Sequence, residues 1–155
     1  MYCFRMPQSH AAILLHIVFS TKNREPLLQK DVRKDVHAYL SGVVRKNGCE
    51  AYRVGGVSDH VHLAVRLSRT ITVADLVKEI KSASSKWMKE KGEGYKTFSW
   101  QQGYGAFSLG ISQKEELIRY IDQQELHHRK LTFKEEYRKF LEKYDVPYDE
   151  RYVWD

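Results

Sequence analysis

The sequence predicts an α+β fold of the ferredoxin-like (split βαβ) class, in which an antiparallel sheet is followed by added C-terminal helices. Three observations lead to this prediction. The chain has 155 residues, the size of one domain with its own hydrophobic core. Segments of period two and segments of helical period follow one another in the order β-α-β-β-α-β, and two helices come after them. The sequence contains no internal repeat, linker or low-complexity stretch.

The first half of the chain predicts three strands and one helix. Residues 11–20 alternate as a strand does. Residues 31–47 show helical spacing of apolar residues between an acidic first turn and a stop at Gly48. Residues 50–57 and 60–67 then predict two strands of a hairpin with a short connection.

The second half begins with a helix whose start is marked by Thr72 and Asp75, a capping-box pattern, and which stops at Gly92. A fourth strand is predicted near residues 104–109. In this topology the first and third strands lie at the centre of the sheet and two helices cover one face. We expect the other face to be available for a ligand.

Two C-terminal helices complete the prediction. Ser112 and Glu115 form a second capping-box pattern, which opens a helix that runs to about His128. A last amphipathic segment covers residues 133–144 and ends before Pro147.

Composition indicates a compartment and a class of partner. Basic residues outnumber acidic ones 26 to 20, and the resulting net charge of +6 favours a polyanion such as nucleic acid. Cys3 and Cys49 form no disulfide framework, so we expect a reducing, cytoplasmic location. The longest apolar run, residues 11–19, is about half of what a bilayer span requires, which argues against a membrane protein.

Two histidines in the third predicted strand form a candidate metal site. Because alternate residues of a strand share a face, Val61 and Leu63 point toward the covering helices. His60 and His62 then point together from the opposite face, about 6–7 Å apart, where they can bind one divalent cation. The same spacing also fits two half-exposed histidines beside a turn.

Tyr120 and Gln124 are spaced i, i+4 in the predicted helix, so their side chains project from one face. If that helix lies against the histidine-bearing face of the sheet, Gln124 offers an oxygen to a metal and Tyr120 offers a nucleophilic phenolate. Otherwise the tyrosine is ordinary amphipathic packing and the glutamine is a solvent residue.

Further polar residues lie near these candidates. His127, His128, Arg129 and Lys130 end the helix with positive charge, which suits either the helix dipole or contact with DNA. His16, on the first strand, either supports the metal site through one of its ligands or is a hydrogen-bonded sheet residue.

The absence of common enzyme motifs excludes several classes of function, and aromatic residues beside lysines suggest a class of ligand. The sequence contains no P-loop, dinucleotide-binding, serine-hydrolase or zincin motif. Lysines beside Trp87, with Trp100, Tyr104 and Phe107 near the fourth strand, suit stacking with single-stranded nucleic acid. The same aromatic residues also suit a hydrophobic core.

Four stretches together resemble the single-tyrosine HUH transposases of the insertion-sequence-200/605 type. In order along the chain they are HIVFSTK at 16–22, DHVHL at 59–63, WQQGYGAF at 100–107 and YIDQQ at 120–124. The resemblance covers roughly residues 11–130 in consistent order.

The resemblance implies a DNA transposase that cleaves and rejoins single-stranded DNA with hairpin ends. It implies that His60, His62 and Gln124 bind Mg²⁺ or Mn²⁺, and that Tyr120 attacks the DNA and forms a 5′-phosphotyrosine bond. A glutamine in place of a carboxylate would leave the site more positive. The resemblance also implies a homodimer, in which the tyrosine-bearing helix of one subunit can complete the histidine site of the other.

The expected organisation is an N-terminal extension at 1–10 with Met6 as an alternative start, a catalytic domain at 11–130, and a tail at 131–155 that packs on or extends that domain. Two alternatives stay open. One is a domesticated, non-catalytic protein that binds single-stranded or hairpin nucleic acid. The other is a metal-dependent phosphodiesterase in which Tyr120 is structural.

Overall fold

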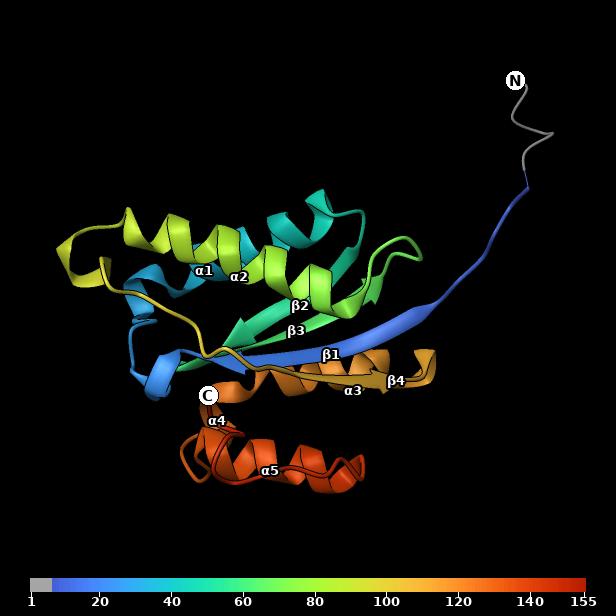
Figure 1. Cartoon of the computed structure of the whole chain (residues 1–155). Coiled ribbons are helices and arrows are strands. Elements are labelled where there is room, and N and C mark those ends of the chain that lie inside the picture. The colour runs from blue at the N-terminus through green and yellow to red at the C-terminus, as the bar shows by residue number, and fades with distance from the viewer. Residues whose placement is uncertain (1–6) are drawn as a thin grey trace.

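The computed structural model describes residues 7–155, and residues 1–6 of the expected N-terminal extension lie outside the described part. A four-stranded antiparallel sheet lies between two layers of helices (Figure 1). The strands are β1 Ile13–Ser20, β2 Glu50–Gly56, β3 His60–Leu67 and β4 Gly105–Leu109. The helices are α1 Lys30–Lys46, α2 Val73–Lys89, α3 Lys114–Asp122, α4 Gln124–His127 and α5 Phe133–Lys143.

The predicted α+β class and the central position of β1 and β3 are confirmed. The strand order is β2-β3-β1-β4, and every neighbouring pair is antiparallel. In the central pair, Val18 lies opposite His62 and Ser20 lies opposite His60. The register therefore brings the polar end of β1 beside the histidine-bearing start of β3.

The main core lies between the sheet and the layer formed by α1 and α2. Alternation on β1 sends Ile17 and Phe19 into this core, where both are fully buried. Thr72 caps α2 as expected, because its hydroxyl accepts a hydrogen bond from the Asp75 amide at 3.0 Å. Trp100 is also buried here and donates to the Ser84 hydroxyl at 2.9 Å, so this aromatic residue is core.

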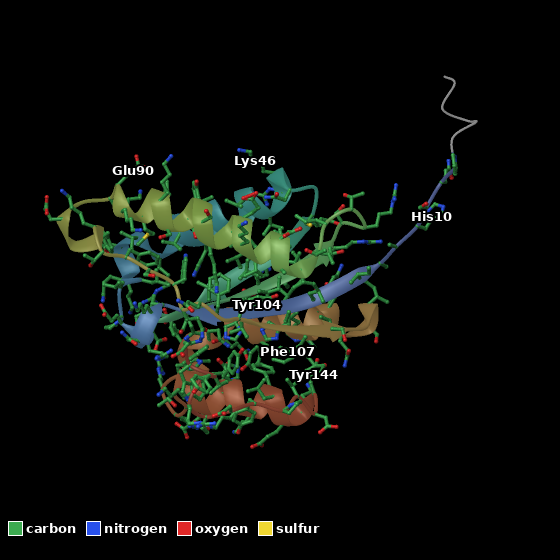
Figure 2. All side chains as sticks on the ribbon, in the orientation of Figure 1. His10, Lys46, Glu90, Tyr104, Phe107 and Tyr144 are labelled. Carbon is green, nitrogen blue, oxygen red and sulfur yellow. The ribbon has the colours of Figure 1, made fainter. Side chains whose placement is uncertain are left out.

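The second face of the sheet is covered, and the expectation of an open face is wrong. The helices α3, α4 and α5 lie against it, as Figure 1 shows. A smaller core fills the space between β1, β4 and α5, which Figure 2 shows occupied by side chains including the labelled Phe107. Its buried members are Val18, Phe107, Phe133, Tyr137 and Leu141. The apolar stripe of α5 needs such a partner, and this face provides it.

The single helix predicted between Ser112 and His128 is divided into three pieces. A 3-10 turn covers Ile111–Gln113, α3 follows, and Gln123 interrupts the path with φ −100° and ψ 18° before α4. The predicted capping box at Ser112 is also wrong. The Gln113 side chain accepts from the Gly110 amide at 3.0 Å, because the tighter turn places these two groups together.

A close contact between α3 and β2 sets the distance of this helix from the sheet. A Cβ atom placed on Gly55 would lie 2.6 Å from the Cγ2 of Ile121 and 3.2 Å from its carbonyl oxygen. The absence of a side chain at Gly55 thus lets α3 approach β2 directly. No helix within residues 7–155 has the length and apolar character needed to cross a bilayer.

This contact generates a prediction about stability. Gly55→Ala should lower the free energy of unfolding by about 1–3 kcal/mol, because the added methyl group overpacks a stiff β-branched side chain and a backbone carbonyl. Urea denaturation followed by circular dichroism measures the change. The matched control is Gly42→Ala in α1, where nothing lies within 4 Å of the added Cβ. That variant should be up to about 1 kcal/mol more stable than the wild type, and equal stability of the two variants would contradict the packing described.

Candidate active site

Strand β3 delivers two imidazoles to the face covered by α3, α4 and α5. Because side chains alternate along the strand, Val61 and Leu63 enter the main core and His60 and His62 face the other way. Both histidines are fully buried. They are therefore not the half-exposed residues that the spacing also allowed.

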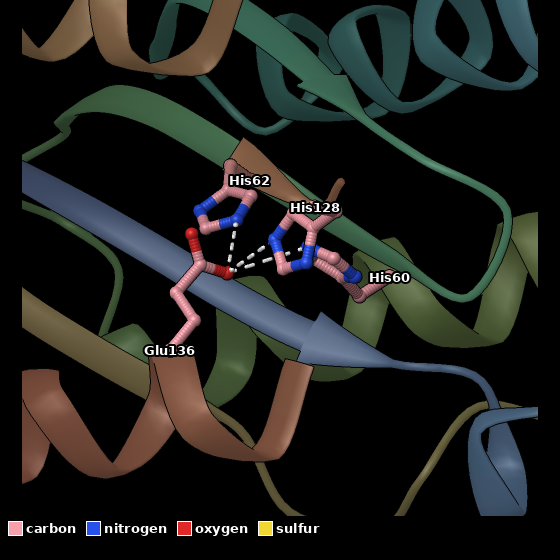
Figure 3. A group of neighbouring side chains, drawn as sticks. All are labelled: His60, His62, His128 and Glu136. Carbon is pink, nitrogen blue, oxygen red and sulfur yellow. Dashed lines mark hydrogen bonds and ion pairs between the residues drawn. The ribbon is translucent and has the colours of Figure 1, made fainter. Parts of the chain in front are cut away.

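A carboxylate from α5 lies at the centre of the site (Figure 3). The Oε1 atom of Glu136 is 3.1 Å from His62 Nε2 and 3.4 Å from His60 Nε2. It is also 3.1 Å from Nε2 of His128, which follows α4. Glu136 is only 2% exposed, and a buried carboxylate is stable only where such partners replace water.

The second carboxylate oxygen connects this cluster to the tyrosine. The Tyr120 hydroxyl donates a hydrogen bond to Glu136 Oε2, and Gln124 Nε2 donates to the same atom at 3.2 Å. Gln124 Oε1 lies 3.1 Å from His60 Nε2. The break at Gln123 thus does not separate Tyr120 from Gln124: both side chains reach the histidine-bearing face of their own chain.

The shared carboxylate governs the acid–base properties of its neighbours. Burial by itself raises the pKa of Glu136, but hydrogen bonds from His128, His60 and His62 outweigh it and hold that pKa far below its usual range. Burial raises the pKa of Tyr120, and the negative charge of Glu136 raises it further. Tyr120 is therefore a protonated hydrogen-bond donor in this arrangement.

Partners on the far side of each ring orient the two strand histidines. The Nδ1 atom of His60 is 2.7 Å from the Asp59 carboxylate, and the Nδ1 atom of His62 is 2.7 Å from His16 Nε2. Burial lowers the pKa of His60, but hydrogen bonds to Asp59 and Glu136 outweigh it and raise the value to about 9. Burial dominates at His62 and at His16, whose pKa values are lowered. His16 thus supports the site through contact with His62.

The donor atoms fit a bound metal ion. Four side chains each place one ligand atom within 4.8 Å of the other three: His60, His62, His128 and Glu136. Ligands that hold a metal at about 2.1 Å are separated from one another by roughly 3–3.5 Å. The three separations between Glu136 and the imidazoles, 3.1 to 3.4 Å, fall in that range. The group is thus able to bind a divalent metal ion.

Aromatic rings hold the Tyr120 side chain in place. His127 packs on the phenol ring with centroids 4.6 Å apart, and Phe140 of α5 approaches it edge-on at 5.9 Å. The Nε2 atom of His127 is buried and has no hydrogen-bond partner among residues 7–155. Arg129 and Lys130 are exposed and lie outside the cluster.

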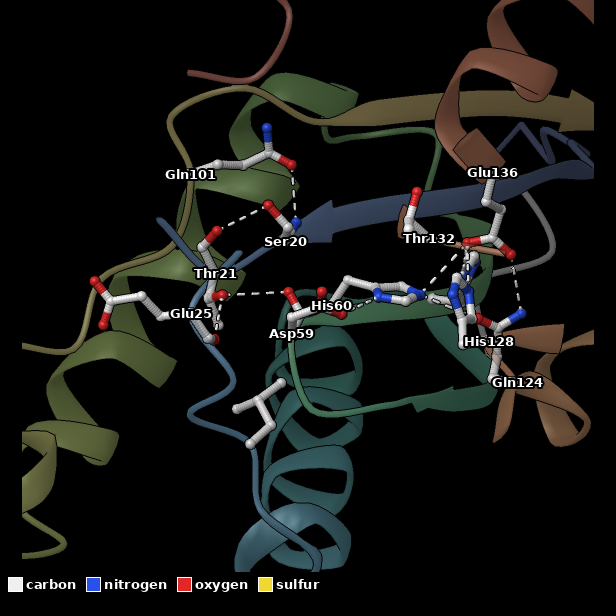
Figure 4. A network of polar contacts seen from close by, with 12 residues as sticks. Ser20, Thr21, Glu25, Asp59, His60, Gln101, Gln124, His128, Thr132 and Glu136 are labelled. Atoms are coloured by element: carbon white, nitrogen blue, oxygen red, sulfur yellow. Dashed lines mark hydrogen bonds and ion pairs between the residues drawn. The ribbon is translucent and has the colours of Figure 1, made fainter. Parts of the chain in front are cut away.

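The turn before His60 is anchored to the end of β1 (Figure 4). The Thr21 amide donates to the Asp59 carbonyl at 2.8 Å, and the Ser20 amide donates to the side-chain oxygen of Gln101 at 2.8 Å. Gln101 is only 3% exposed. A continuous polar network therefore runs from the segment before β4 to the histidines.

The sequence analysis missed Glu136, and the expectation of a site without a carboxylate is wrong. A signal for it exists in the sequence. The capping box of Thr132 and Glu135 fixes the start of α5, and the apolar stripe through Phe133 and Phe140 then places Glu136 on the buried side. An acidic residue within an apolar stripe indicates a buried charge that needs partners. His128 belongs to the cluster, although the sequence marked it only for a supporting or DNA-contacting role.

Comparison with known proteins supplies the family. Residues 9–124 match the family described as Transposase IS200 like. The ISDra2 transposase TnpA of Deinococcus radiodurans is 26% identical over 116 residues, which cover 70% of this chain and 81% of that protein. The family match over residues 9–124 includes His60, His62, Tyr120 and Gln124. His128 and Glu136 lie beyond its C-terminal end.

Two solved structures share the fold. A Deinococcus radiodurans R1 protein provisionally described as a transposase has a TM-score of 0.60 at 22% identity, covering 77% of this chain and 98% of that chain. A REP-associated tyrosine transposase, solved with a REP hairpin bound, has a TM-score of 0.58 at 16% identity, covering 79% and 74%. Because the family match extends over well more than half of the sequence, the chain belongs to the IS200-like transposases, a family of single-tyrosine DNA strand transferases.

Proposed function

We propose that this chain cleaves and rejoins single-stranded DNA through a covalent bond between Tyr120 and a DNA 5′-phosphate, with a divalent metal in the histidine cluster. One observation carries the proposal: the Tyr120 hydroxyl and three imidazoles share the carboxylate of Glu136. A phenol placed beside a metal-binding group is the arrangement that nucleophilic attack on a phosphodiester needs.

The chemistry is a balanced exchange of ester bonds. The Tyr120 oxygen forms a bond to phosphorus, the bond from phosphorus to the 3′-oxygen breaks, and the 3′-oxygen leaves with the electron pair and takes a proton. The proton lost by the phenol balances the proton gained by the 3′-oxygen, and Glu136 orients the hydroxyl as its hydrogen-bond acceptor. In the reverse direction a 3′-hydroxyl attacks the phosphotyrosine and Tyr120 recovers its proton. The covalent bond conserves the energy of the phosphodiester, so no nucleotide cofactor is required.

We infer that the protein ligands are His60, His62, His128 and Glu136, with Gln124 within reach as an alternative. When bound, a divalent cation would supply a Lewis acid for a phosphate oxygen. It would also offset part of the Glu136 charge, which adds to burial in raising the pKa of Tyr120. Three imidazoles with one carboxylate favour Mn²⁺ over Mg²⁺, because Mg²⁺ prefers an all-oxygen shell.

Within one chain, Tyr120 contacts Glu136 of its own α5. We propose an active site of this arrangement, and exchange of the tyrosine-bearing helix between subunits stays the alternative that the resemblance implies. The homodimer implied by the family resemblance stays a prediction, which analytical ultracentrifugation can test.

Loss of the Tyr120 hydroxyl should abolish covalent attachment of the protein to DNA. Wild-type protein incubated with Mn²⁺ and labelled single-stranded DNA from the flanks of its gene should form a covalent adduct on a denaturing gel, and a chelator should abolish it. Tyr120→Phe should form none. The control Tyr144→Phe removes a hydroxyl that bonds the Ser108 carbonyl and should keep the adduct.

Each remaining hypothesis has its own outcome in this assay. If the protein is a phosphodiesterase that uses water as nucleophile, the Tyr120→Phe variant would still cleave DNA. A non-catalytic binding protein would bind the DNA but yield neither cleavage nor adduct with the wild type.

Substitutions at Glu136 and Gln124 distinguish a metal site that includes the carboxylate from one that includes the amide. Glu136→Gln should weaken Mn²⁺ binding at least about tenfold in isothermal titration calorimetry, because it removes the only anionic ligand of the cluster. Gln124→Ala should change the affinity less. The reverse order of effects would assign the metal to His60, His62 and Gln124 and leave Glu136 as a hydrogen-bonding residue.

A further inference from the structure

Two hollows adjoin where the β2–β3 turn meets the N-terminal end of α1 and the segment after α4. One has a volume of about 680 Å³ and the other about 520 Å³. They share four lining residues: Lys30, Arg33, Glu125 and Arg129. We call the two hollows together the basic trough. It passes around the end of β2 and so connects the layer of α1 with the layer of α4 and α5.

The trough carries positive charge that no acidic group among the described residues neutralises. Four of its lining residues are exposed cations with no acidic partner among residues 7–155: Lys30, Lys34, Arg129 and Lys130. The acidic residues that line it already have partners. Glu125 pairs with Arg33 at 3.3 Å, and Asp122 pairs with Arg53 at 3.5 Å.

The larger hollow ends at the candidate active site. Asp59 and His128 both line it. Asp59 holds His60 through its Nδ1 atom at 2.7 Å, and His128 contacts Glu136 at 3.1 Å. A chain of phosphates in the trough would therefore meet residues that touch the catalytic cluster.

A residue that lines the smaller hollow has an unsatisfied polar atom beneath the surface. His37 lines it, and the Nε2 atom of this histidine is buried without a hydrogen-bond partner in the described residues. Burial lowers the pKa of His37 to about 4, so its ring is neutral at physiological pH. His37 therefore adds no charge to the trough, whose positive charge comes from its lysines and arginines.

We propose that the basic trough binds the phosphate backbone of the single strand next to the cleaved phosphodiester. The proposal rests on the proposed function, because it takes the strand that Tyr120 cleaves as the ligand. Single-stranded DNA is a flexible polyanion. It fits a hollow that carries four cations without an acidic partner among residues 7–155 and that ends at Asp59 and His128, which contact the catalytic cluster.

The test measures DNA binding by fluorescence anisotropy between about 50 and 200 mM salt. The DNA carries a hairpin and its single-stranded flank. One variant changes Lys30, Lys34, Arg129 and Lys130 to alanine. The matched control changes four exposed cations in the last turns of α1 and α2 to alanine, namely Arg45, Lys46, Lys86 and Lys89, none of which lines the trough. Both variants lose the same charge, so a difference between them reports position and not net charge.

We expect the trough variant to bind at least about tenfold more weakly at 0.1 M salt, and the slope of log K against log salt to fall by about 3. The control should keep a slope close to that of the wild type. Equal losses of DNA affinity in both variants would overturn the proposal. The proposal would also be overturned if the trough variant lost as much affinity for a hairpin that lacks the single-stranded flank.

The adduct assay keeps this proposal separate from the proposed function. A wild type that forms no adduct would refute the strand-transfer chemistry. A wild type that forms the adduct, with a trough variant that binds as well as the control, would refute the trough alone.

Discussion

The buried carboxylate of Glu136 is the interaction on which the site depends. One oxygen faces three imidazoles and the other faces the Tyr120 hydroxyl and the Gln124 amide. A single carboxylate removed from water is thus compensated by polar groups from four segments. These segments are α3, β3, the start of α4 and the residues that follow α4. Truncating any of these partners would leave a buried charge less compensated, so the carboxylate links the position of the Tyr120 hydroxyl to that of the three imidazoles.

The motifs that mark the family in the sequence converge in space for physical reasons. The polar end of β1 anchors the Asp59 turn, and Gln101 anchors the same end of β1 from the segment before β4. These hydrogen bonds hold the backbone from which His60 projects. Residues far apart in the chain therefore serve one purpose, the fixed placement of two imidazoles, and their joint occurrence is more specific than any of them alone.

Local patterns predicted most of the fold, and failures arose where tertiary contacts decide. The alternation of apolar and polar residues was sufficient to predict the strands. The Thr72 cap was sufficient to predict the start of α2, because this hydrogen bond is local to the helix. The interruption at Gln123 has no local breaker such as proline or glycine, so helical periodicity passed over it. The open sheet face was an error of the same kind, since the stripe of α5 shows an apolar side but not where it packs. His60, His62, Tyr120 and Gln124 were found by motif, whereas Glu136 was missed because its partners are all distant in sequence.

The donors of the candidate metal centre come from three segments: the sheet, the connection after α4, and α5. A ligand that needs all of them binds only when α5 is docked. Mass action then couples the two processes, and a ligand at 100 times its Kd adds about 2.7 kcal/mol to the cost of undocking this helix. With the proposed ligand set, the attachment of the C-terminal segment would depend on the concentration of free metal, and the resistance of that segment to proteolysis would report how fully the centre is loaded.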